Sequence, residues 1–216
     1  MSDMSSQPRS VKIGDNERTG WSSDRPRRPG EPERPPRKLD VSVRGRVLAP
    51  SDRLRYSPGS LLLIACPDAT TREPFSERVL TEKGALLTLG KIRALLRGKV
   101  AEAELDEKAH ALLENAAAKR LAAGQTVVIA LESLDAEERE RYVQAAAAAG
   151  RPRHLILVEA GRERLSDEDK AELGELRTAL DAGAMGQEGF ATSLRLSGAA
   201  VAELKRIVFA PPPRDD

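Results

Sequence analysis

The chain has 216 residues, of which 40% are hydrophobic and 32% charged, and its formal net charge is +1. At roughly 100–200 residues per domain this length allows one domain plus a tail, and a net charge near zero excludes a protein whose whole surface binds nucleic acid. No apolar run approaches the roughly 18 residues that span a bilayer, no secretory signal is recognisable, and the single Cys66 excludes an intramolecular disulfide framework. We therefore expect a cytoplasmic protein with no membrane association.

Residues 1–40 differ in composition from the rest of the chain. They contain six of the 14 prolines, and nine Lys or Arg stand against seven Asp or Glu. Such a segment cannot bury enough apolar surface to offset the entropy of ordering it, so we predict a disordered tail. Its basic cluster Arg25–Arg28 and the lone Trp21 are candidate contacts for a protein or nucleic-acid partner. Residues 211–216 are predicted to be a short tail of the same kind.

Between the tails, residues 41–210 alternate between strand-like and helix-like patterns. Alternating or continuous apolar runs predict strands over 41–48, 61–65, 85–89, 126–131, 154–159 and 190–196. Segments with helical composition predict helices over 73–83, 91–96, 102–123, 135–149, 166–182 and 199–208. Three residues fix boundaries: Pro74 suits a first helical turn, Gly124 caps the long helix, and Asp135 opens a capping box with Glu138.

Strands that alternate with helices predict an α/β fold, in which a mostly parallel sheet has helices on both faces. Ligands of such sheets bind beyond the C-terminal ends of the strands. In this chain those ends carry residues 66–72, 90–91, 132–134 and 159–164, which therefore form the candidate site.

The first of these ends has the layout of a phosphate-binding loop, because a buried strand feeds a tight turn and then a helix N-terminus. The residues that make such a loop work are absent, however. There is no glycine from Leu61 to Lys83, and no Lys followed by Ser or Thr where phosphate and magnesium would be held. The pattern predicts an architecture more clearly than an activity.

Stretches in the second half of the chain resemble P-loop kinases of the polynucleotide-kinase-like and zeta-toxin-like kind. They are residues 120–128 (RLAAGQTVV), 135–139 (DAEER), 151–157 (RPRHLIL) and 188–190 (EGF). The resemblance covers about residues 60–197. It implies a P-loop NTPase fold, AAA-like, and phosphoryl transfer from ATP with magnesium wherever the functional residues match.

In the predicted phosphate loop the functional residues do not match. Residues 66–73 (CPDATTRE) stand where such kinases have a Gly-rich run. Arg72 replaces the lysine of that run and Glu73 replaces the magnesium-binding hydroxyl, while Thr70 and Thr71 complete the loop. These four residues are the candidate nucleotide contacts of a degenerate loop.

Elsewhere the match to the family is partial. Lys91 lies where the family has an Asp that handles the acceptor hydroxyl, and the family's acid on the third strand aligns with Ala130. Arg93, and Arg162 or Arg164 in a lid-like turn, match family-type arginines. The resemblance therefore makes Lys91 and Arg93 candidate substrate contacts, and Arg162 and Arg164 candidate catalytic residues.

For Arg72 and several carboxylates, a structural role is the alternative to a functional one. Arg72 is expected to pair with Asp68 or Glu73 on its own loop rather than with a phosphate. Glu132, two residues past the aligned position, is a candidate catalytic acid with a slipped register, and its alternative is a strand end that faces solvent. Asp68, Glu132 and Glu159 all follow strand ends, so we hypothesise that they form an acidic rim that binds a cation or a basic partner.

The remaining reactive side chains point to structural roles. Cys66 has no base paired with it in the sequence and is predicted to be a small buried apolar residue. His110 and His154 are isolated from each other and from other ligand types, so no metal site is predicted.

We favour a catalytically degenerate P-loop kinase-like domain that acts as a binding or regulatory module and recruits a protein partner through residues 1–40. One alternative is an ATP- or GTP-dependent kinase of a nucleic acid or small molecule. A second is a nucleic-acid-binding protein in which Arg72, Arg93 and the tail arginines contact phosphates, and a third is a scaffold for a single protein. Affinity that falls steeply with salt would mark the second.

Overall fold

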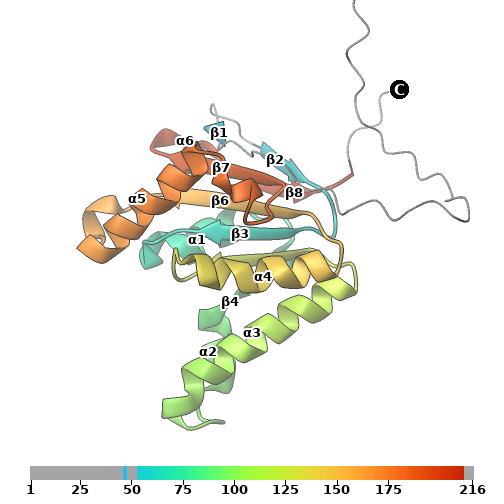
Figure 1. Ribbon diagram of the computed structural model, residues 1–216. Coiled ribbons are helices and arrows are strands. Elements are labelled where there is room, and N and C mark those ends of the chain that lie inside the picture. The colour runs from blue at the N-terminus through green and yellow to red at the C-terminus, as the bar shows by residue number, and fades with distance from the viewer. Residues whose placement is uncertain (1–45, 48–52, 212–216) are drawn as a thin grey trace, which may run out of the picture. The chain divides into compact units, whose positions relative to one another are not determined.

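The computed structural model describes residues 46–47 and 53–211, and within them strands and helices alternate along the chain (Figure 1). The strands are β1 (Arg46–Val47), β2 (Arg53–Tyr56), β3 (Leu61–Ala65), β4 (Leu86–Thr88), β5 (Val127–Leu131), β6 (Arg153–Glu159), β7 (Thr192–Ser197) and β8 (Arg206–Phe209). The helices are α1 (Ala69–Val79), α2 (Leu89–Leu96), α3 (Leu105–Ala122), α4 (Ala136–Ala148), α5 (Asp167–Asp181) and α6 (Ala199–Glu203). Short 3-10 helices lie at Lys83–Ala85, Glu102–Glu104, Arg162–Arg164 and Ala184–Gly186.

The described strands form a six-stranded sheet in the order β1-β7-β6-β3-β5-β4, and its neighbouring strands are parallel. This confirms the predicted α/β fold class. Leu61 of the central strand β3 pairs with both Val127 and Arg153. After β3 the chain adds β4 and β5 on one side and then β6 and β7 on the other. The switch in direction therefore lies at β3, and a ligand site is expected at its C-terminal end.

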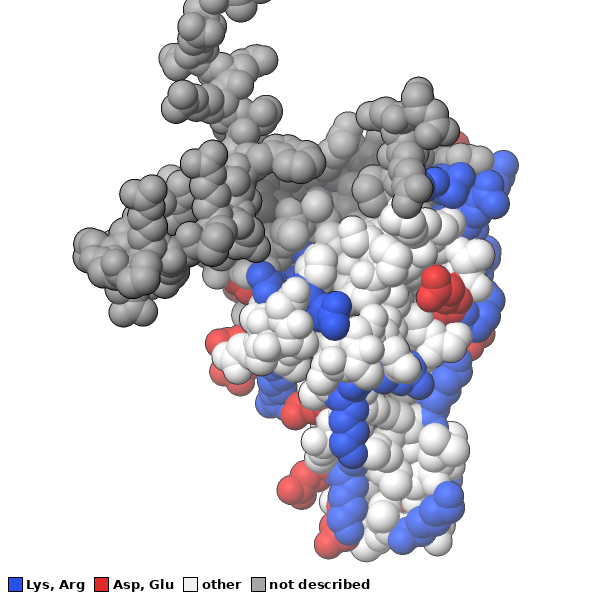
Figure 2. Space-filling view, turned by 90° about the vertical axis from the view of Figure 1, so that its right-hand side faces the viewer, with Lys and Arg blue, Asp and Glu red and all other residues white. Residues whose placement is uncertain are grey.

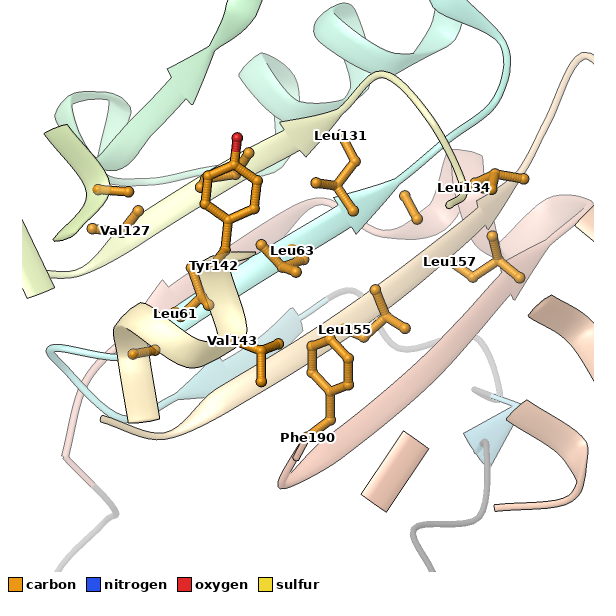
Figure 3. Close-up of a cluster of buried hydrophobic side chains, with 14 of the residues drawn as sticks. Leu61, Leu63, Val127, Leu131, Leu134, Tyr142, Val143, Leu155, Leu157 and Phe190 are labelled. Carbon is orange, nitrogen blue, oxygen red and sulfur yellow. The ribbon is translucent and has the colours of Figure 1, made fainter. Parts of the chain in front are cut away.

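All five residues of β3 are fully buried, because both faces of the sheet are covered. On one face, Leu61 and Leu63 contact a cluster supplied by α2, α3, α4 and α5, and Figure 3 shows Tyr142 and Val143 of α4 in this cluster. On the other face, Leu62 and Ile64 pack against α1, α6 and a separate parallel pair, β2 and β8. Helices thus cover both faces, as predicted.

The helix predicted over 73–83 begins four residues earlier and ends at Val79, so Pro74 lies inside α1 rather than in its first turn. Asp68 is the residue before the helix, and its carbonyl accepts from the backbone N–H groups of Thr71 and Arg72, both at 3.0 Å. The Pro74 signal was misread because the helix begins before Pro74, where the Asp68 carbonyl already accepts these backbone hydrogen bonds. The loop between β3 and α1 is therefore reduced to residues 66–68.

The helix predicted over 199–208 is also wrong in its second half. The helix α6 ends at Glu203, and Arg206–Phe209 forms β8, which pairs with β2. Ile, Val and Phe favour a strand once they can pack on a sheet, and here Ile207 and Phe209 are buried in the second core cluster. The partner strand β2 was not predicted at all.

The predicted helix ends hold elsewhere, with one exception. Gly124 ends the long helix with a φ of 75°, and Asp135 accepts from the backbone N–H of Glu137 at 3.2 Å. The predicted capping box is wrong, because Glu138 accepts from the backbone N–H of Ser133 at 3.1 Å instead of from that of Asp135. A full capping box occurs at the start of α5, between Ser166 and Asp169.

Some predictions lie outside the described residues. These are the tail at 1–40 with Trp21 and Arg25–Arg28, and the tail at 211–216 apart from Pro211. Of the strand predicted over 41–48, the described part is β1, which lies beside β7 at the edge of the sheet. In the described part of the chain, no helix is both long and apolar enough to cross a membrane.

Candidate functional site

The turn after β3 places the carboxylate of Asp68 over the first turn of α1. This carboxylate accepts hydrogen bonds from the Thr70 hydroxyl at 2.9 Å and from the Thr71 hydroxyl at 2.5 Å. The Arg164 guanidinium, which reaches it from the loop after β6, donates from Nη2 at 2.6 Å. The Asp68 side chain is only 5% exposed. The loop after β3 thus holds a negative charge of the protein, the Asp68 carboxylate.

The charge of this anion is stabilised by its contacts. Hydrogen bonding from Arg164 holds the pKa of Asp68 well below its usual range. Burial opposes this lowering of the pKa, and hydrogen bonds from the Thr70 and Thr71 hydroxyls add to it. The same contact raises the pKa of Arg164. Asp68 is therefore ionised at neutral pH, and Thr70, Thr71 and Arg164 direct donors at it.

Gly161 allows the loop after β6 to approach this carboxylate. Its φ is 65°, and a Cβ at this position would lie 2.3 Å from Oδ2 of Asp68 and 2.5 Å from Nη2 of Arg164. A glycine is required here both by the backbone conformation and by the lack of space. Arg162, the first residue of the 3-10 helix Arg162–Arg164, is exposed.

The depressed pKa of Asp68 makes stability depend on pH in a defined direction. Because the pKa is lower in the folded state than in the unfolded state, the ionised carboxylate stabilises the fold above its unfolded pKa of about 4, and this contribution is lost as pH falls through the folded value. We expect Asp68→Asn to be clearly less stable than the wild type in urea at about pH 7, and the gap to narrow below about pH 4.

Asp167→Asn is the matched control for that measurement, because Asp167 is fully exposed and its pair with Lys170 is on the surface. It should lose little stability at any pH. A gap between Asp68→Asn and wild type that stays constant from neutral to acid pH would contradict the assignment of the charged form to Asp68.

Arg72 is directed away from the candidate phosphate position. Its guanidinium donates to the carbonyl of Glu132 at 2.9 Å and to that of Cys66 at 3.4 Å, and the residue is buried. The expected pair of Arg72 with Asp68 or Glu73 is therefore wrong: Asp68 pairs with Arg164, and the Glu73 carboxylate lies against Gly90, where a Cβ would be 2.8 Å from it. Arg72 instead ties the end of β5 to the end of β3.

The candidate substrate residues lie on α2. Arg93 donates from Nη1 to both carboxylate oxygens of Glu132, at 2.7 and 2.8 Å, and from Nε to Asp106 at 2.6 Å. Lys91 pairs with Glu77 of α1 at 2.8 Å on an exposed surface. Glu132 thus contacts an arginine rather than facing solvent, contrary to the structural alternative suggested by the sequence.

The three carboxylates of the hypothesised acidic rim do lie at strand ends, but each faces an arginine. Asp68 pairs with Arg164, Glu132 with Arg93, and Glu159 with Arg177 at 3.0 Å. Within the described residues no group of three or more His, Cys, Asp or Glu is arranged to hold a metal ion. The rim is therefore close to electrically neutral.

The isolated reactive residues occupy structural positions. Cys66 is fully buried, as predicted, and burial raises the pKa of its thiol to about 11. His154 is buried beside the ring of Tyr56, shares a hydrogen bond of 2.8 Å with Thr192, and has its pKa lowered to about 4 by burial and by Arg153. The structure places neither residue with a catalytic partner.

An open pocket of about 750 Å³ lies beside Asp68, at the C-terminal ends of β6 and β7. Its walls are Thr70, Thr71, Pro74, Phe75, Arg78, Glu159, Ala160, Gly161, Gly198, Val201 and Ala202. Sequence reasoning missed Phe75, Arg78 and Gly198. Arg78 stands over the Phe75 ring and donates to the carbonyls of Val201 and Leu204 at 2.7 and 2.6 Å. The only available signal was Gly198, two residues after the strand predicted over 190–196.

Comparison with known proteins identifies a family for this chain. A family model described as an AAA domain matches residues 62–172. No curated protein matches the chain.

Among solved structures, the Mycobacterium tuberculosis APS kinase CysC in complex with AMPPNP and APS is 17% identical, with a TM-score of 0.39 over 68% of this chain and 95% of that one. The Deinococcus radiodurans tunicamycin resistance protein is 15% identical, with a TM-score of 0.37 over 71% of this chain and 99% of that one. A gluconokinase from Sinorhizobium meliloti 1021 is 10% identical, with a TM-score of 0.38 over 69% and 95%. TM-scores below 0.5 are too low to transfer a site or a substrate from these proteins.

Proposed function

The chain belongs to the AAA domain family, and we propose that its P-loop kinase-like domain is a binding or regulatory module that does not transfer phosphoryl groups. Within this family, we propose that the chain is related to the polynucleotide-kinase-like and zeta-toxin-like proteins that its sequence resembles. The partner in this proposal is a protein recruited through residues 1–40, and the location is the cytoplasm.

The observation that carries the proposal is the carboxylate of Asp68. A phosphate at a helix N-terminus is held by backbone N–H groups, hydroxyls and a cation. Here the Thr70 and Thr71 hydroxyls and the Arg164 guanidinium already surround a buried anion. A nucleotide phosphate at this position would meet the negative charge of Asp68 at close range, which costs free energy instead of providing it.

The other residues of the turn support the same reading. Phosphoryl transfer depends on positioned cations and magnesium ligands around the phosphates. Arg72, in the place of the family's lysine, is buried and bonded to two main-chain carbonyls, and Glu73 offers a second negative charge where a hydroxyl would be needed. The residues present do not fit a magnesium-bound triphosphate.

An ATP- or GTP-dependent kinase is the second candidate, because one observation favours it. The pocket of about 750 Å³ opens directly beside Thr70, Thr71 and Gly161, at the strand ends where α/β proteins bind ligands. Under this candidate the nucleotide would have to displace Arg164 from Asp68. Arg162, which is exposed in the same turn, would then be available to a phosphate.

Calorimetric titration with ATP and GTP, with and without magnesium, tests the proposal. We expect no binding at millimolar nucleotide by the full chain, and no phosphate transfer from Mg-ATP to a nucleic-acid acceptor. Asp68→Asn, which removes the competing charge, is expected to bind the triphosphate more tightly than the wild type does.

Micromolar, magnesium-dependent binding by the wild type that is lost in Thr71→Val would overturn the proposal and establish the kinase. Thr178→Val is the control, because its hydroxyl bonds to the Gly174 carbonyl on the exposed face of α5, far along the chain from the site. Arg72→Ala can be added, but its loss of buried contacts also affects folding, so the hydroxyl variant is decisive.

A further inference from the structure

Three arginines lie along the edge of the sheet where the strands begin, opposite the edge that carries Asp68. Arg120 is in the last turn of α3, Arg151 lies between α4 and β6, and Arg153 opens β6. Each is half-buried, and each donates to a main-chain carbonyl: Arg120 to Gly84 at 2.6 Å, Arg151 to Leu121 at 3.1 Å and Arg153 to Gly189 at 2.6 Å. Each guanidinium is therefore held by one hydrogen bond and keeps further N–H donors.

Within the described residues, these three arginines have no carboxylate partner. In the described ranges, no carboxylate lies within ion-pair distance of Arg120, Arg151 or Arg153, and the neighbouring Lys119 is exposed and has no ion pair either. Arginines elsewhere do have carboxylate partners, among them Arg93, Arg139, Arg141, Arg164, Arg177 and Arg195. Acidic residues near this edge are Glu82, which lines a shallow hollow with Arg120, and Glu188, which pairs with Arg139.

The helix ends explain only part of this arrangement. The C-terminal carbonyls of α3 carry partial negative charge and attract a cation, which accounts for the bond from Arg151 to Leu121. A guanidinium has five N–H donors, however, and each of these arginine side chains donates one hydrogen bond within the described residues. Figure 2 faces this side of the molecule and shows basic side chains spread over its described surface, with fewer acidic ones.

Small residues bring the backbone close to these charges. The Arg151 guanidinium lies over Gly124, where a Cβ would be 2.9 Å from Nη2, and beside Gly59, where a Cβ would be 3.5 Å from Nη1. We call Lys119, Arg120, Arg151 and Arg153, with these two glycines, the basic face.

We propose that the basic face binds the sugar-phosphate backbone of double-stranded nucleic acid without sequence preference. The planar fork of N–H donors on an arginine side chain matches phosphate oxygens. Proteins that bind single strands add exposed aromatic rings for base stacking, whereas in the described part of the chain the exposed large hydrophobic residues are Leu95 and Leu112. Backbone contacts alone suit a duplex, whose phosphates follow a regular path. This surface is separate from the Asp68 site and does not depend on the function proposed for it.

The test is fluorescence anisotropy of a labelled DNA duplex of about 20 base pairs with the full chain, from about 50 to 200 mM salt. We expect log affinity to fall with log salt with a slope of about −3, as for three to four phosphate contacts. Arg120→Gln with Arg151→Gln should weaken binding at least about tenfold at low salt and reduce the slope by about 2.

The control is Arg97→Gln with Lys99→Gln, which removes the same charge from the exposed turn after α2 and should change affinity less than about twofold. Gln125→Glu keeps every arginine hydrogen bond and adds a negative charge beside Arg120, so it should also weaken binding. The proposal would be overturned if the control and the basic-face variant lost equal affinity, or if Gln125→Glu had no effect. It would also be overturned if the chain did not bind the duplex at low salt, or if it bound poly-glutamate more tightly than DNA.

Discussion

Replacing Arg139 by alanine is expected to lower the free energy of unfolding by about 3 kcal/mol, because it leaves a carboxylate and a carbonyl without their partner. Arg139 lies on α4 with its side chain 5% exposed. It donates from Nε and Nη2 to the two oxygens of Glu188, both at 2.9 Å, and from Nη1 to the carbonyl of Leu134. This single side chain joins the start of α4 to the segment that leads into β7.

Arg141→Ala is the matched control for Arg139→Ala, since it removes the same charge two residues later on the same helix. Arg141 pairs with Glu114 on the surface, and such an exposed pair contributes little to stability. Urea denaturation of both variants measures the difference. Replacing both partners, Arg139→Met with Glu188→Leu, should recover much of the loss, because no charge is then left unpaired. If Arg139→Ala lowers the free energy of unfolding by no more than Arg141→Ala does, the contacts of Arg139 with Glu188 and Leu134 do not stabilise the fold as argued.

Gly161→Ala is expected to have the second largest effect, about 3 kcal/mol, and to separate Arg164 from Asp68. An alanine with a φ of 65° costs about 1–2 kcal/mol from backbone strain alone. The added Cβ would also lie 2.3 Å from the Asp68 carboxylate, so that either the loop or the carboxylate must move. The remaining cost comes from the broken contacts of a buried anion.

Gly150→Ala separates these two contributions. Gly150 has the same φ of 65°, and nothing lies within 4 Å of a Cβ built on it. Its variant should therefore lose only the cost of backbone strain, about 1–2 kcal/mol. Equal losses for the two alanine variants in urea would show that the approach of Gly161 to Asp68 has no energetic consequence.

The central part of the fold could be predicted because its signal is local. The continuous apolar runs of β3, β5 and β6 and the Gly124 helix end are each recognisable within a few residues of sequence. The start of α1 was placed wrongly because two local signals, Asp68 and Pro74, compete within six residues, and only the hydrogen bonds of Asp68 decide between them. Similarly, β8 is a strand only because β2 pairs with it, and no local pattern contains that pairing.

The positions of the candidate residues in the fold could be predicted from the sequence but their contacts could not, and their functional roles stay predictions. Asp68 and Glu132 follow the ends of β3 and β5, and Arg164 lies in the loop after β6. Thr71 and Arg93 lie on α1 and α2, the helices that follow β3 and β4. Which arginine meets which carboxylate could not be predicted, because the partners are far apart in sequence. Asp68 and Arg164 are separated by 96 positions, and Arg93 and Glu132 by 39. Arg139 was missed entirely, since a charged residue on a helix is usually solvated.

The small parallel pair of β2 and β8 has a consequence for the order in which the protein folds during synthesis. The two strands lie at opposite ends of the described domain: Arg55 of β2 donates to the carbonyl of Pro211, 156 positions later, and Thr81 after α1 donates to that of Ile207, 126 positions later. Because β8 emerges from the ribosome after every other described strand, the part of this core that Ile207 and Phe209 complete, beside Leu54 and Tyr56 of β2, stays uncovered until β8 has been made. Nascent chains stalled before Arg206 would therefore expose this surface to chaperones.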